Sequence, residues 1–142
     1  MNPKEVTFSI NLNSLVLKSS NKLKEQPDRI KAAILRYKML LILANKFPKI
    51  CFSPDVEVDE IFHLHLLRPN FYYKDSINNF GRIINHIPES KKTTNKSFHE
   101  RIELTKKYWF NFYKEKYPDN IVFAWCGVSG DDDTNGDNDD KR

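Results

Sequence analysis

The carboxylate of Asp59 and the imidazoles of His63 and His65 lie within the largely apolar segment Val58–Leu67. Asp59 and His63 are four residues apart, so on an α-helix their side chains are neighbours on one face. This spacing can present an oxygen and an imidazole nitrogen to one metal ion. It can equally let the carboxylate orient and charge-stabilise the imidazole of an acid–base site. The pair therefore predicts either chemistry.

Other polar side chains downstream can complete such a site. The predicted metal ligands are Asp59, His63 and His86. The side chains expected to line the pocket around them are His65, Tyr72 and Asp75. His65 points away from His63 on a regular helix, so the two imidazoles are not expected on the same ion. The expected cofactor is a divalent metal (Zn, Fe or Mn) or none, and no residue is assigned a catalytic role.

The structural alternative uses the same residues without any ligand. The helix is apolar almost all round, so Asp59, His63 and His65 occupy positions expected in the core, where polar groups need partners. Asp59 and His63 can form a buried pair, while His65 and His86 join helices to loops through backbone carbonyls. His99 is expected at the surface. The spacing by itself is compatible with both the structural and the functional interpretation.

Five helices are expected to position these groups, which makes the fold all-α: a compact bundle with short loops. The clearest helix begins at Pro27 and ends before Pro48, because apolar residues recur along it at spacings of four and three. A shorter helix is expected before it, starting near Asn13 and extending through Leu23.

The helix that carries Asp59 is predicted to begin at Ser53-Pro54, a capping hydroxyl followed by proline, and to end near Leu67. The next helix is predicted over about 70–80, with Gly81 as a left-handed cap.

The last helix is predicted to open with a capping box at residues 97–100 and to end before Pro118. A short segment over 121–125, either extended or docked, follows.

Charge divides the chain unevenly. Residues 131–142 contain six Asp, one Lys and one Arg, a net charge of −4, whereas the whole chain carries +4, so the remainder carries +8. We predict a single helical domain over 1–128 and a disordered acidic tail over 129–142. The basic body predicts an acidic protein or RNA as partner, which the acidic tail could shield. In the alternative interpretation these basic side chains only form solvated helix faces and bind no partner.

The basic residues include Lys18, Lys22, Lys24, Arg29, Lys31, Arg36 and Lys38 early in the chain, and Lys91, Lys92, Lys96, Arg101, Lys106, Lys107, Lys114 and Lys116 later.

Several protein classes are disfavoured. The chain has no glycine-rich phosphate motif, no zinc-spaced cysteine cluster and no nucleophile elbow. No run of about 18 apolar residues exists, so no membrane span or membrane partner is expected. Residues 1–20 lack the pattern of a secretory signal, and Cys51 and Cys126 are isolated in sequence. We therefore expect reduced thiols and a cytoplasmic protein.

The pattern over Ser53–Pro88 resembles the glycine-rich domain-containing protein-like family, a domain of unknown function found in bacteria and plants. The resemblance rests on Val58–Leu67, Tyr72, Asp75, Phe80-Gly81 and His86-Ile87-Pro88. It implies that the family's polar positions fall on Asp59, His63, His65, Tyr72 and His86.

The chain departs from that family pattern at four positions. Phe62 stands where the family has Trp, Ser76 where it has Cys, Asn85 where it has the first His of a pair, and Arg68 where it often has Asp. A site that needs the Cys or both histidines would be compromised here. A site built from Asp59, His63 and His86 would survive, although the resemblance implies no particular reaction.

Three hypotheses remain open at this point. The first is a small binding or regulatory domain with a buried Asp/His pocket that holds a divalent metal. The second is an enzyme, either a metal-assisted hydrolase or an acid–base catalyst that uses His63 oriented by Asp59. The third is an interaction domain in which the histidines are purely structural and the basic surface binds an acidic protein or RNA.

Overall fold

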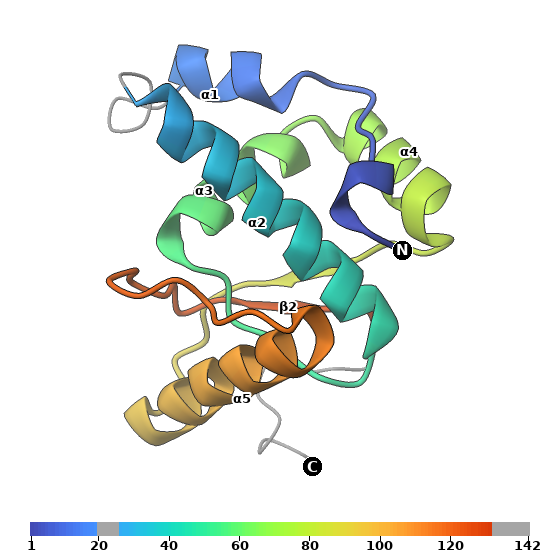
Figure 1. Ribbon diagram of the computed structural model, residues 1–142. Coiled ribbons are helices and arrows are strands. Elements are labelled where there is room, and N and C mark those ends of the chain that lie inside the picture. The colour runs from blue at the N-terminus through green and yellow to red at the C-terminus, as the bar shows by residue number, and fades with distance from the viewer. Residues whose placement is uncertain (20–25, 132–142) are drawn as a thin grey trace. The chain divides into compact units, whose positions relative to one another are not determined.

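The computed structural model describes residues 1–19 and 26–131. Over these residues the chain forms five α-helices, one short 3₁₀-helix and one two-stranded antiparallel sheet, which confirms the mostly helical fold class (Figure 1). None of the helices in this described part is long and apolar enough to span a membrane. The predictions made for Leu23 and for tail residues 132–142 lie outside the described residues.

The chain divides into two compact units. The first comprises Met1–Ile42 and Glu57–Ile83, and the second comprises Leu43–Val56 and the chain from Ile84 onward. The first unit holds the 3₁₀-helix η1 (Pro3–Glu5), α1 (Leu12–Ser19), most of α2 (Pro27–Lys46), α3 (Val56–Leu66) and α4 (Pro69–Phe80). The second holds β1 (Asn85–Ile87), α5 (Asn95–Tyr113) and β2 (Gly127–Ser129).

α2 and α4 have the bounds that their sequence patterns predict. Ile30, Tyr37 and Ala44 on α2 are each 0% exposed, so the helical spacing of apolar residues identified most of the buried face, although Ile34 on the same face is only partly buried. α4 ends at Gly81, which adopts the left-handed conformation (φ 73°) and donates its N–H to the carbonyl oxygen of Ile77. Glycine adopts this conformation at little steric cost, which explains why the helix terminates there.

The predicted start of α3 at Ser53-Pro54 is wrong, because the helix begins at Val56. Ser53 does not cap it. Its backbone N–H donates to the Thr105 hydroxyl (2.9 Å), and its own hydroxyl accepts from Arg101 Nε (2.8 Å). These partners come from α5, about fifty positions further along the chain. The residues before α3 are therefore held in an extended conformation by tertiary hydrogen bonds.

The segment after α5 supplies the other partners of this extended stretch. The backbone N–H of Val56 donates to Val122 O, and that of Ala124 donates to Pro54 O, both at 2.9 Å. Within the predicted segment 121–125, Phe123 forms an isolated antiparallel bridge with Asp55. Asp55, which is 0% exposed, also accepts a hydrogen bond from the Tyr117 hydroxyl.

α5 starts earlier than predicted. Its N-cap is Thr94, whose hydroxyl accepts from Ser97 N while the Ser97 side chain accepts from Thr94 N. A capping box is present, but Ser97 is its third helical residue and not its cap, so the predicted start is wrong by three positions. The helix ends at Tyr113, where Lys114 takes the left-handed conformation, before Pro118 is reached.

The small sheet of the second unit was not predicted. β1 and β2 pair antiparallel, with Asn85 opposite Ser129 and His86 opposite Val128. Ser129 is buried, and its hydroxyl donates to Pro48 O (3.0 Å), although the sequence analysis placed this residue in the tail. Strands of three residues are too short to show an alternating pattern, which is why the sequence did not reveal them.

Candidate functional site

α3 presents its two histidines to different surroundings. The side chain of His63 is 52% exposed and that of Asp59 is 17% exposed, with 3.6 Å between His63 Nε2 and Asp59 Oδ1. His65, two positions further along, is 1% exposed. Positions two apart on a helix point about 200° apart, so one imidazole can be buried while the other faces solvent. The prediction of a core position is therefore correct for His65 and wrong for His63.

His65 is the centre of a buried hydrogen-bonded chain that joins three helices of the first unit. Its Nδ1 lies 2.8 Å from the Tyr37 hydroxyl on α2, and its Nε2 lies 2.8 Å from Asp75 Oδ2 on α4. The second carboxylate oxygen of Asp75 accepts the backbone N–H of Ser9 at 2.7 Å. In the structural alternative His65 bonds backbone carbonyls, whereas both ring nitrogens here contact side chains.

The protonation of this chain follows from its burial. Burial raises the pKa of Tyr37 well above its usual value, so the phenol keeps its proton and donates to His65 Nδ1. Burial also lowers the pKa of His65, although the hydrogen bond to Asp75 opposes this effect. The neutral imidazole then carries its proton on Nε2 and donates to Asp75. With this tautomer every donor meets an acceptor, in the order Tyr37, His65, Asp75.

Aromatic rings enclose the same imidazole. The Phe8 and Tyr72 rings both meet it edge-on, with centroids 5.0 and 4.9 Å away. Tyr72 is itself buried, and its ring lies against the His65 imidazole. Catalysis by His65 would require substrate access. A side chain that is 1% exposed among these rings instead fixes the packing of α2, α3 and α4.

The N-terminal segment is held against α4 by the same polar cluster (Figure 1). Asn79 accepts the N–H of Thr7 (3.1 Å) and donates to its carbonyl oxygen (2.8 Å), while Asp75 accepts from Ser9. The sequence analysis missed both Tyr37 and Ser9 as partners of this cluster. A hydroxyl on the apolar face of α2 was the available signal, because a buried tyrosine normally finds a polar partner.

His86, the third predicted metal ligand, belongs to the second unit. It lies in β1 and is partly buried, and one of its ring nitrogens lies within 4.8 Å of the sulfur of Cys126. Cys126 was predicted to be a reduced thiol and was not among the predicted ligands. Both cysteines are buried and neither forms a disulfide. Asp59 and His63 lie in the first unit, so the assembly of the three predicted ligands at one ion stays a prediction.

Comparison of the chain with protein-family models, with curated proteins and with solved structures finds no match. The resemblance of Ser53–Pro88 to the glycine-rich domain-containing protein-like family therefore stays a prediction. Function is inferred from geometry and chemistry alone.

Proposed function

We propose that this chain is a binding domain for a divalent transition-metal ion, with Asp59 and His63 as the anchoring ligands. The observation that supports it is the 3.6 Å separation of Asp59 Oδ1 and His63 Nε2 on a partly exposed face of α3. An ion about 2.1 Å from each atom bridges this separation with an angle close to tetrahedral. The remaining positions are open to water or to further ligands.

The same distance weighs against the acid–base alternative. A carboxylate that orients an imidazole does so through a hydrogen bond, and 3.6 Å exceeds the range of such a bond. A metal ion placed between the two atoms accounts for the gap, whereas direct orientation of His63 by Asp59 does not. Metal-assisted hydrolysis also requires the ion first, so metal uptake is the earlier test of both proposals.

The identity of the metal follows from the donor atoms. A carboxylate oxygen with an imidazole nitrogen suits zinc, iron and manganese alike. His86 was predicted from the sequence as a third ligand, and its neighbour Cys126 offers a sulfur. A thiolate favours zinc over manganese, because manganese prefers oxygen donors. The general affinity order of divalent metals also places zinc above manganese for a carboxylate and imidazole pair, so we expect zinc to bind more tightly than manganese.

Calorimetric titration with zinc tests the proposal, using protein purified without a metal-affinity column. We expect one equivalent to bind, and Asp59→Asn and His63→Ala each to lower the affinity more than about tenfold. His86→Ala and Cys126→Ser, made separately, measure the contribution of the second pair. His99→Ala is the matched control, because it removes an exposed imidazole from α5. Unchanged binding in both α3 variants would rule the proposal out.

A further inference from the structure

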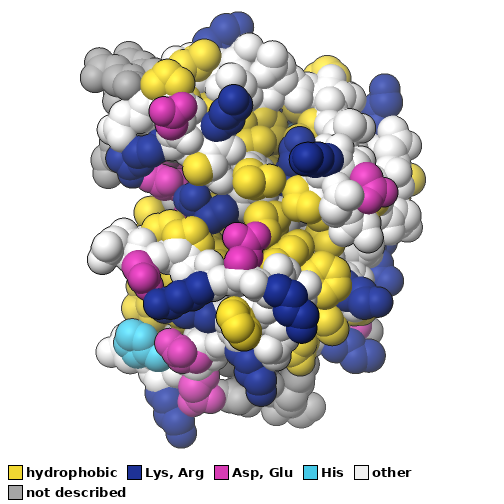
Figure 2. Space-filling model, viewed as in Figure 1, with side chains coloured by type: hydrophobic (Ala, Val, Ile, Leu, Met, Phe, Trp, Pro, Cys, Tyr) yellow, Lys and Arg dark blue, Asp and Glu magenta, His cyan; other side chains and the backbone are white. Residues whose placement is uncertain are grey.

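The first unit also contains a groove whose lining residues do not belong to the polar clusters described above. It has a volume of about 280 Å³ and is formed by η1, α1 and α2. Its lining combines the apolar residues Pro3, Ile34 and Leu35, which we call the floor, with the lysines Lys4, Lys31 and Lys38, which we call the rim. We call this feature the lysine groove. Figure 2 shows hydrophobic side chains exposed over α1 and α2 with basic side chains beside them.

The spacing of residues on α2 creates this pattern. Lys31, Ile34, Leu35 and Lys38 stand at positions i, i+3, i+4 and i+7, which share one face of a helix. Two aliphatic side chains are thus bracketed by one lysine on the turn before and one on the turn after. Leu35 is 49% exposed, which is a large fraction for a leucine in the middle of a twenty-residue helix.

The rim charges are available for a ligand. Among the described residues, none of Lys4, Lys31 and Lys38 forms an ion pair. The Lys38 ammonium lies 5.6 Å from the centroid of the Phe8 ring, which holds it in place without neutralising it. The neighbouring carboxylate of Glu5 accepts the backbone N–H of Asn2 and so caps η1. The groove therefore combines an apolar floor with uncompensated positive charge.

We propose that the lysine groove binds an acidic segment of a partner protein that carries aliphatic side chains between its carboxylates. Carboxylates would pair with the rim lysines while an aliphatic side chain covers Ile34 and Leu35, because both features of the groove then find a complement. This proposal is independent of metal binding by Asp59 and His63.

Two other anionic occupants match the groove less well. Single-stranded RNA is normally bound on aromatic rings that stack with the bases, and none of the residues that line the groove is aromatic. The chain's own acidic segment from Asp131 to Asp140 carries the charge but no apolar side chain, so it leaves the floor uncovered. An acidic, aliphatic peptide satisfies both the rim and the floor.

Fluorescence anisotropy with the full chain tests this inference. The probe is a labelled peptide that alternates glutamate with leucine, compared with a glutamate–serine peptide and with oligouridine. We expect the leucine-containing peptide to bind at least about tenfold more tightly than the other two probes, since covering half-exposed aliphatic side chains is worth about that factor. Amide shifts in NMR spectra should map its binding to η1 and to α2 around Leu35.

Variants separate the groove from general charge attraction. Lys31→Glu with Lys38→Glu should weaken binding about tenfold, and Leu35→Gln should do the same while keeping a good helix former. Lys31→Glu alone, expected to cost about two- to fivefold, avoids any disturbance of the Lys38–Phe8 contact.

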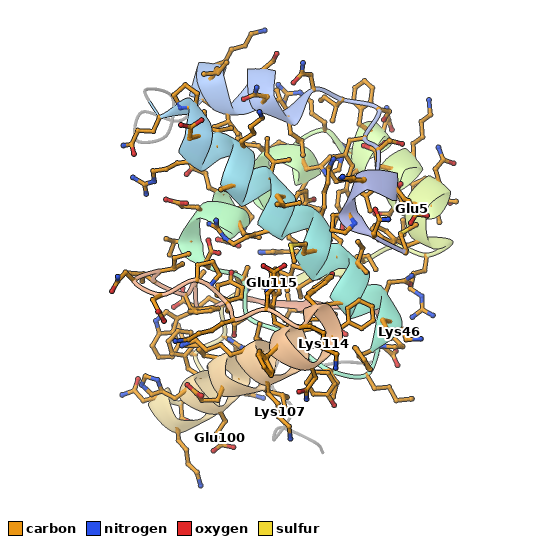
Figure 3. The ribbon with its side chains drawn as sticks, in the orientation of Figure 1. Glu5, Lys46, Glu100, Lys107, Lys114 and Glu115 are labelled. Atoms are coloured by element: carbon orange, nitrogen blue, oxygen red, sulfur yellow. The ribbon has the colours of Figure 1, made fainter. Side chains whose placement is uncertain are left out.

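The matched control for these variants is Lys46→Glu with Lys107→Glu, which changes net charge equally at two exposed lysines of the second unit that do not line the groove (labelled in Figure 3). This control should bind as the wild type does. Equal weakening in the control, tighter binding of oligouridine, or equal affinity for the glutamate–serine peptide would each overturn the proposal.

Discussion

The Tyr37–His65–Asp75 chain makes a quantitative prediction about coupling between two residues that share one imidazole. Tyr37→Phe removes the donor to His65 Nδ1 and leaves a buried acceptor without a partner, which costs about 1–3 kcal/mol. In wild type, the two carboxylate oxygens of Asp75 accept from Ser9 N–H and from His65 Nε2–H. Asp75→Asn leaves only one oxygen for these two donors. One buried donor is left unsatisfied, again at a cost of about 1–3 kcal/mol.

The double variant should cost less than the sum of the two single variants. With Tyr37 replaced, His65 can move its proton to Nδ1 at no additional loss, because Nδ1 already lacks a partner. Its Nε2 then accepts from the nitrogen of the amide introduced by Asp75→Asn, and the oxygen of that amide accepts from Ser9. One group is unsatisfied in place of two, so the coupling should be about 1–3 kcal/mol.

Urea unfolding followed by far-ultraviolet circular dichroism measures these free energies. The matched control is a second double-mutant cycle that combines Tyr72→Phe with Asp75→Asn. The Tyr72 hydroxyl is hydrogen-bonded to Ser76 and not to His65. That control pair should be additive within about 0.5 kcal/mol. Additivity in the Tyr37 pair, or equal coupling in both pairs, would refute the assigned direction of the hydrogen bonds.

Three further predictions follow from individual contacts. Burial lowers the pKa of His65 below about 6.5, so below this pH the unfolded chain binds a proton that the folded chain does not bind. The free energy of unfolding should therefore fall as the pH drops below about 6.5, by up to about 1.4 kcal/mol per pH unit. An equal pH dependence in His65→Gln, measured by urea titration, would contradict this. Gly130→Ala should destabilise the protein by more than about 1 kcal/mol, because the new Cβ would lie 2.5 Å from a backbone oxygen. Thermal unfolding should show that this variant is less stable than Gly81→Ala, because Gly81 is left-handed (φ 73°) but has open space around it. The reverse order of stability would contradict the described packing around Gly130. Arg101→Met should lower the free energy of unfolding by about 2–4 kcal/mol in chemical denaturation, because it removes the guanidinium that donates to Trp125 O at 2.6 Å. A near-neutral result would show that water replaces the guanidinium.

The sequence predicted those elements whose signals are local. Most of the buried face of α2 and the glycine cap of α4 need only the residues around them, and both were correct. The start of α3 was wrong because Ser53, a good cap by type, bonds Thr105 and Arg101 instead. A local rule cannot anticipate partners contributed by a helix about fifty positions away.

The candidate site was predictable in its members but not in its grouping. His65 and Asp75 were identified as polar residues near a pocket, yet their bond to each other and to Tyr37 depends on how three helices pack. The exposure of His63 was missed for a related reason. An apolar helix predicts burial on most faces, but the sequence does not say which face is left uncovered.

Anomalous X-ray scattering at the zinc absorption edge tests the metal proposal most directly, using crystals grown from protein supplied with one equivalent of zinc. The proposal predicts a peak about 2.1 Å from His63 Nε2 and within bonding distance of an Asp59 carboxylate oxygen. An ordered imidazole and carboxylate with no anomalous peak between them would contradict it.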